Sequence, residues 1–129
     1  MKPITLEWIE KAEADFVAAQ REYRARKNPL YDISCFHAQQ CAEKYLKAKL
    51  EEHTIVFSKT HDLLVLLEML LPLEPTWFIL QEDMSILTGF AVAFRYPGIS
   101  ATKAMAKDVL QRCQRVRQSV RESFGLSLP

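Results

Sequence analysis

The chain has 129 residues, of which 49% are hydrophobic and 26% are charged, a balance that predicts one globular domain over residues 1–129. Seventeen basic residues oppose sixteen acidic ones, and this formal net charge of +1 indicates no polyanionic partner by itself. The three glycines lie too far apart for a P-loop or a dinucleotide-binding fingerprint and are too few for an all-β fold with many tight turns, so the composition favours helices.

Two long helices are predicted in the first part of the chain. The first covers residues 5–27, with Thr5 as its N-cap and apolar residues recurring every three or four positions on one face. The second begins at Asn28 and Pro29, a cap residue followed by proline in the first turn, and ends near His53. Its inward face includes alanines that allow close helix packing: Tyr31, Cys35, Ala38, Ala42, Tyr45 and Leu46.

Three further helices are predicted in the second part. A short and nearly all-apolar helix over residues 61–71, capped by Thr60, is expected to be buried. A fourth helix covers residues 75–94, and after a proline–glycine turn a fifth runs from its cap Ser100 to about Phe124. Five helices with short connections predict an all-α fold, an up-and-down antiparallel four-helix bundle with one short additional helix.

The predicted fourth helix carries two apolar faces. One consists of Trp77, Leu80, Met84, Leu87, Ala91 and Phe94, and the nearly opposite one contains Ile79, Ile86, Phe90 and Ala93. A helix on the outside of a bundle needs only one apolar face. Either this helix is central and touches helices on both sides, or Ile79, Ile86 and Phe90 form an interface with a second copy or a partner protein.

Charge is distributed unevenly along the second half of the chain. Residues 61–94 carry five acidic residues and no Lys or Arg, whereas residues 100–124 carry six basic residues against two acidic ones. One interpretation is a pair of helices with complementary charge inside one bundle. The other is a basic surface for phosphate or RNA.

Cysteine usage and the apolar segments indicate the compartment. The three cysteines are odd in number and form no CxxC pair, so buried free thiols are expected rather than disulfides or a zinc site. We expect neither a metal nor a cofactor. Residues 1–16 lack the apolar core of a signal peptide, and the apolar stretch at 63–73 is broken by Glu68 and Pro72. A cytoplasmic protein without a membrane partner is therefore expected.

Two polar segments of the chain are candidates for contacts with a ligand. In residues 36–50, the helical wheel places His37, Gln40, Glu43, Lys44 and Lys47 opposite the apolar face. They form either a solvated face, with an i,i+4 pair between Glu43 and Lys47, or a set of ligand contacts. In residues 59–67, His61 lies near a helix N-terminus, where a neutral imidazole is favoured over a cation and can make one hydrogen bond that fixes the loop.

A third segment, residues 94–98, places an arginine before a rigid turn. Arg95 lies at the end of the predicted fourth helix and is followed by Tyr96, Pro97 and Gly98. Its guanidinium either caps the last carbonyls of that helix or binds an anion together with the backbone donors at the start of the fifth helix.

Taken in order, these segments resemble the HEPN family of small prokaryotic helical proteins. The similarity is carried by A-Q-Q-x-A-E-K-x-L-K-A-x-L at residues 38–50, K-T-H-D-L at 59–63 and F-R-Y-P at 94–97, and it covers nearly the whole chain. The resemblance implies the helical bundle already predicted, often as a homodimer. It also implies frequent pairing with a separate minimal nucleotidyltransferase in a toxin–antitoxin-like pair, and a role in nucleotide or RNA handling.

One departure from the family pattern bears on activity. Many members of the family are metal-independent ribonucleases with an Arg-x4–6-His motif. Arg95 matches the arginine, but Ser100, Ala101 and Thr102 stand where the histidine is needed. Without a positioned acid or base the nuclease chemistry loses a large part of its rate, so the sequence favours a protein that is not an enzyme.

The first functional hypothesis is therefore a non-catalytic module. It would dimerise and bind a nucleotide, another phosphate-bearing ligand or a partner nucleotidyltransferase. Arg95 would pair with phosphate and Tyr96 would stack on a base, and the further ligand contacts would come from Lys44, Lys47 and His61.

Two alternatives remain open at the level of sequence. One is a ribonuclease with a displaced site, in which Arg95 and His61 act together across a dimer. The other is a purely structural interaction protein whose interface is formed by Ile79, Ile86 and Phe90.

Overall fold

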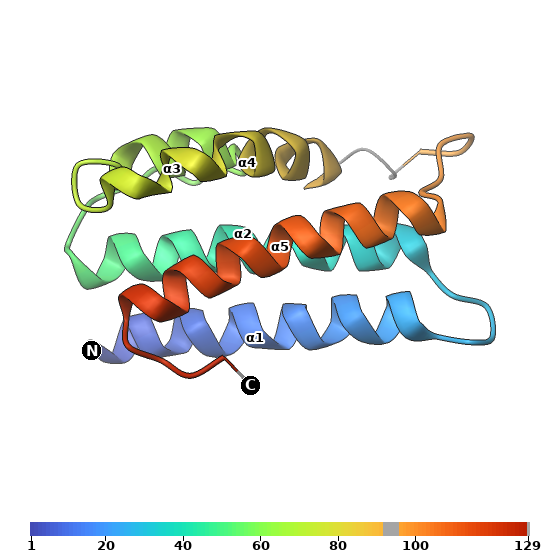
Figure 1. Cartoon of the computed structure of the whole chain (residues 1–129), viewed down its shortest axis with the longest axis horizontal. Coiled ribbons are helices and arrows are strands. Elements are labelled where there is room, and N and C mark those ends of the chain that lie inside the picture. The colour runs from blue at the N-terminus through green and yellow to red at the C-terminus, as the bar shows by residue number, and fades with distance from the viewer. Residues whose placement is uncertain (92–95, 129) are drawn as a thin grey trace.

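The protein is a bundle of helices. The computed structural model describes residues 1–91 and 96–128. The helices are α1 (Pro3–Arg24), α2 (Tyr31–Glu52), α3 (Leu63–Leu70), α4 (Gln81–Thr88) and α5 (Lys103–Ser123). In Figure 1, α2 and α5 lie between α1 on one side and the α3–α4 hairpin on the other. The predicted all-helical bundle is confirmed, and no strand occurs in the described residues.

The core follows the apolar periodicity of the long helices. Ala12 and Ala19 of α1 and Ala38 and Ala42 of α2 are fully buried, and these two helices pack against each other. Tyr45 and Leu46 of α2 are also fully buried. The three cysteines are free and buried, as predicted. Burial raises the pKa of the Cys35 thiol to about 12, and the negative charge of Asp32 adds to this shift. Among the described residues, no helix has the length and apolar character needed to cross a membrane.

The predicted starts of the first two helices are wrong by a few residues. The first helix begins at Pro3 rather than Thr5, because proline is accommodated in the first turn. Thr5 is buried, and its hydroxyl donates to Glu52 Oε1 at 2.9 Å, which joins the start of α1 to the end of α2. Asn28 has a φ of +50°, so it belongs to the turn between α1 and α2 and does not cap α2.

The caps of the later helices are also displaced. Asp62 caps α3 by accepting from the Leu64 amide at 3.0 Å. The Thr60 hydroxyl instead accepts from the Asp62 amide at 3.1 Å, before the helix begins. Thr102, and not Ser100, caps α5 by accepting from the Met105 amide at 3.1 Å. Several cap-forming residues stand close together at each of these starts, so residue type alone does not select the one that caps.

The prediction of one continuous fourth helix is wrong. Its segment consists of a 3₁₀ turn at Pro75–Leu80, α4 itself and a second 3₁₀ turn at Gly89–Ala91, and residues 92–94 lie outside the described residues. The face that contains Trp77, Leu80, Met84 and Leu87 is buried, as predicted. Ile79 is 69% exposed and Ile86 is also exposed, whereas Phe90 is half-buried against the core. The segment is therefore peripheral, and the interpretation of a central helix is wrong.

Complementary charges join α4 to α5, which confirms one interpretation of the uneven charge distribution. The buried Asp83 carboxylate accepts from Arg112 Nη1 at 3.0 Å and from Arg115 Nη2 at 2.7 Å. The two remaining arginines of α5, Arg117 and Arg121, pair with Glu13 of α1. These four guanidinium groups are therefore engaged within the fold.

Candidate functional site

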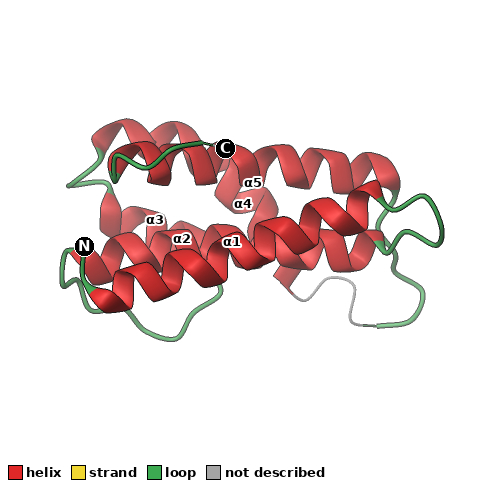
Figure 2. Cartoon of the chain, turned by 90° about the horizontal axis from the view of Figure 1, so that it is seen from below, coloured by secondary structure: helices red, strands yellow, loops and turns green. Residues whose placement is uncertain are grey.

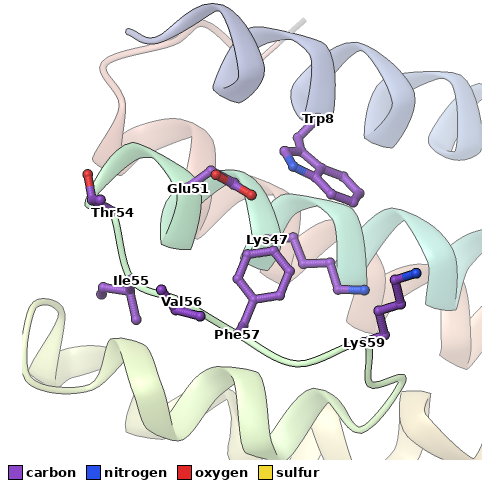
Figure 3. Close-up of a pocket in the computed structure, with 8 residues that line it drawn as sticks. All are labelled: Trp8, Lys47, Glu51, Thr54, Ile55, Val56, Phe57 and Lys59. Carbon is purple, nitrogen blue, oxygen red and sulfur yellow. The ribbon is translucent and has the colours of Figure 1, made fainter.

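Three of the residues predicted to contact a ligand lie along one polar seam at the surface of α2, two of them on the helix itself and one on the connection that follows it. The residues Lys44, Lys47 and His61 all pair with carboxylates that line this seam. The interpretation of a solvated face is wrong, because Glu43 is 3% and Lys47 is 7% exposed. After α2 ends, the connection over residues 53–62 runs back alongside the helix and covers this face (Figure 3).

Glu43 is the centre of the seam. Its Oε2 accepts from the Lys47 ammonium at 3.0 Å, and its Oε1 lies 2.8 Å from His61 Nδ1. The Gln39 amide donates to the same Oε1 at 3.2 Å and to the His61 carbonyl at 3.4 Å. These bonds fasten the returning connection to α2, although the His61 side chain is 67% exposed. A buried carboxylate therefore orients an imidazole that solvent reaches.

Lys44 pairs with the first helix. Its ammonium lies 2.5 Å from Asp15 Oδ2, and His37 Nδ1 lies 2.7 Å from the other oxygen of the same carboxylate. Asp15 is buried, so this pair is partly shielded from water. Lys44 and Lys47 thus each have a carboxylate partner, and their charges are already balanced within the fold.

The turn after residue 95 presents an exposed ring. Arg95 itself lies outside the described residues. Tyr96 is 70% exposed, and Gly98 in the same turn has a φ of +91°, a conformation that favours glycine. The Ala101 amide donates to Asp32 Oδ1 of α2 at 2.5 Å, and Thr102 caps α5. Residues 100–102, where the histidine of the motif would stand, thus join this turn to α2 and form the start of α5.

A basic pocket, which the sequence patterns did not single out, lies at the same end of the bundle. Its volume is about 630 Å³, and its walls come from the α1–α2 turn and the start of α5, which Figures 1 and 2 place together. It is lined by Tyr23, Arg24, Ala25, Arg26, Pro29, Tyr31 and Lys103. The Tyr23 and Tyr31 ring centroids are 6.4 Å apart and the planes are tilted by 53°. No acidic residue contributes to the lining.

The cations of this basic pocket differ from Lys44, Lys47 and the four arginines of α5, which are all paired with carboxylates. Arg24, Arg26 and Lys103 are exposed and form no ion pair with any residue in 1–91 or 96–128. The sequence does contain a signal for this pocket: Y-R-A-R-K-N-P-L-Y at residues 23–31 interleaves aromatic and basic residues. The helical pattern alone assigned these residues to a helix end and a turn.

Comparisons with known proteins place this geometry in a family. The sequence matches the model of the HEPN domain over residues 5–123. Among solved structures, the fold is similar to the crystal structure of an archaeal HEPN homologue, with a TM-score of 0.74 and 23% sequence identity over 95% of this chain and 98% of the other. A comparison with curated proteins finds no match. In the described part of the chain, no cluster of three or more His, Cys, Asp or Glu side chains is arranged to hold a metal ion.

Proposed function

Because the chain belongs to the HEPN family, we propose that it is a non-catalytic HEPN module that binds a nucleotide or another phosphate-bearing ligand in the basic pocket. The observation that carries the proposal is a set of cations around one cavity, Arg24, Arg26 and Lys103, that form no ion pair within the described residues. Two of them are arginines, whose planar groups pair with phosphate oxygens in a bidentate manner. A cavity of about 630 Å³ also has room for a small ligand.

The aromatic residues of the basic pocket complete the match to a nucleotide. A base has a flat π-face that stacks on tyrosine, and Tyr23 and Tyr31 both line the cavity. Tyr96 lies in the connection that leads to α5 at the same end of the bundle. In the proposed complex, Arg95 and Tyr96 add a phosphate contact and a stacking surface. Lys44, Lys47 and His61 are paired with carboxylates and do not line the basic pocket, so they have no part in this complex.

The roles of residues 100–102 support the non-catalytic part of the proposal. An imidazole in this stretch would supply the acid or base that the family motif requires. Ala101 instead joins the stretch to Asp32, and Thr102 supplies the cap of α5. Binding without cleavage is the function favoured by the absence of a histidine at residues 100–102.

Isothermal titration calorimetry tests the proposal directly. We expect ATP to bind more tightly than AMP at low salt, because its extra phosphates meet three unpaired cations, and we expect added salt to weaken both. A short single-stranded RNA should bind as well. If no heat is observed for any of the three at millimolar ligand, nucleotide binding is wrong and the proposed function reduces to a partner protein.

A displaced ribonuclease site is the second candidate function, and one contact favours it. His61 Nδ1 lies 2.8 Å from the buried Glu43 carboxylate while its ring is exposed, as in acid–base sites where a carboxylate orients the imidazole. Cleavage of single-stranded RNA without added metal is then expected for the wild type and should be lost in both Arg95→Ala and His61→Ala. Equal cleavage by all three preparations would mean a contaminating nuclease.

The exposed apolar residues of the α4 segment support dimerisation or the binding of a partner nucleotidyltransferase. Phe78, Ile79 and Ile86 are exposed on this side, and Phe90 is half-buried beside them. We expect the wild type to be a homodimer by light scattering and Ile79→Asp to be a folded monomer. Val56→Asp, at a valine on the 53–62 connection that is even more exposed than Ile79, is the control and should remain dimeric. A dimer that survives Ile79→Asp would contradict this interface.

A further inference from the structure

A second cavity lies near the C-terminal end of α2 and has no part in the proposed function. Its volume is about 430 Å³, and it is open to solvent between α1, α2 and the 53–62 connection (Figure 3). Trp8 of α1 and Phe57 of the connection form its aromatic walls, and Ile55 and Val56 add apolar surface. Cavities of this size with apolar walls and few polar groups are typical of sites for small ligands.

The Lys47 ammonium in this wall has hydrogen-bonding capacity to spare. One of its three N–H groups donates to Glu43, and no other acceptor for it occurs among residues 1–91 and 96–128. The Lys47 side chain is only 9% exposed, and its nitrogen lies 5.8 Å from the ring centroids of both Trp8 and Phe57. The ammonium group has one protein acceptor and lines the cavity, so an anionic acceptor bound there can take a further N–H group.

A second cation reinforces this preference. Lys59 is exposed, lines the same cavity and forms no ion pair within the described residues. In Figure 3 the ammonium groups of Lys47 and Lys59 point to one side of the cavity, whereas Glu51 lies on the other side. Glu43 neutralises Lys47 and Glu51 is the acidic residue of the lining, so the charges around the cavity balance. Lys59 forms no ion pair within the described residues, and it is the cation with which a monoanion would pair.

We propose that this cavity binds a small monocarboxylate with an aromatic or branched apolar body. Its carboxylate accepts from Lys47 and Lys59, and its body packs on Trp8, Ile55 and Phe57. The apolar walls distinguish this site from the basic pocket, where three unpaired cations meet two tyrosines. Neither site shares a residue with the other, so this inference does not depend on the proposed function.

The indole N–H signals provide a direct readout, since the chain has two tryptophans. Phenylacetate is titrated into ¹⁵N-labelled protein, and the Trp8 signal is assigned through Trp77→Phe. We expect a saturable shift of the Trp8 signal and an unchanged Trp77 signal, because Trp77 is buried away from this cavity. The absence of a saturable Trp8 shift at millimolar phenylacetate would overturn the site.

Matched ligands and variants test the charge assignment. Phenethylamine has a similar body and the opposite charge, and we expect it to bind at least about five-fold more weakly than phenylacetate. Lys59→Gln should weaken phenylacetate by about five-fold and should fold normally because the side chain is exposed. Lys107→Gln, at an exposed lysine of α5, should have no effect. Equal binding of the amine, or no effect of Lys59→Gln, would contradict the carboxylate assignment.

Discussion

Replacement of Glu13 by glutamine is expected to lower the free energy of unfolding by about 3 kcal/mol. The Glu13 carboxylate accepts from Arg117 Nε at 2.8 Å and Nη2 at 2.7 Å, and from Arg121 Nη1 at 3.3 Å. Both arginines are buried, and Arg121 also donates to the Tyr45 hydroxyl at 3.1 Å. Loss of the carboxylate leaves two buried guanidinium groups without their counter-charge, and this is the costly way to break a buried ion pair.

Urea denaturation of the wild type and Glu13→Gln measures this loss. Glu10→Gln is the matched control, because Glu10 is an exposed residue of the same helix and forms no ion pair among the described residues. It should unfold at nearly the wild-type urea concentration. If Glu13→Gln is as stable as Glu10→Gln, the pairing of α5 to α1 through Glu13 does not stabilise the bundle.

The same residue makes stability depend on pH. Burial raises the pKa of the Glu13 carboxyl, but hydrogen bonds from Arg117 and Tyr45 and the charges of Arg117 and Arg121 outweigh it, so the pKa falls below 4.5. A lowered folded-state pKa gives stability that is full above the unfolded-state pKa and is lost as the pH falls through the folded-state pKa. The difference in stability between the wild type and Glu13→Gln should therefore shrink below about pH 4.5. A difference that grows with acidification would contradict the assignment.

Replacement of Glu43 by methionine is expected to cost about 3 kcal/mol as well, for a related reason. Glu43 is the carboxylate partner of the buried Lys47 and also holds His61 and Gln39. Its loss leaves an ammonium group unpaired beneath the 53–62 connection and detaches that connection from α2. Urea denaturation reports the first effect, and faster amide hydrogen exchange at residues 53–62 reports the second.

The double variant Glu43→Met with Lys47→Met separates charge from packing. It removes the unpaired ammonium, so the double variant should be more stable than Glu43→Met alone. Replacing both partners of a buried ion pair with apolar residues is often neutral, whereas removing one partner is costly. Hydrogen exchange in the connection should remain fast, because His61 still lacks its anchor. Additive losses in the double variant would mean that the Glu43–Lys47 pair is not the source of the cost.

The helical architecture was predictable because its signal is local. Apolar residues at steps of three and four identified the buried faces of the long helices, including Ala38 and Ala42 of α2. The α4 segment has the same periodicity, yet 3₁₀ turns interrupt it, and Ile79 and Ile86 of its second apolar face are exposed. Periodicity shows that a face is apolar, but it does not show which face a neighbour covers.

The candidate sites were less predictable because they depend on contacts between distant segments. The helical wheel placed Glu43 and Lys47 opposite the core, where solvent is expected, and it contains no information on a connection that returns over them. The basic pocket joins Arg24 and Arg26 to Lys103, which is far away in the sequence. Counting charge over residues 100–124 instead emphasised arginines that the fold neutralises.

In the proposed function, the cations of the basic pocket bind the phosphates of a nucleotide. The most direct test compares ATP binding by calorimetry in the wild type and in Arg24→Glu with Lys103→Glu, with Lys107→Glu as an exposed-lysine control on the same helix as Lys103. We expect more than about ten-fold weaker binding in the double variant and a near wild-type dissociation constant in the control. Equal ATP affinity in all three proteins would contradict it.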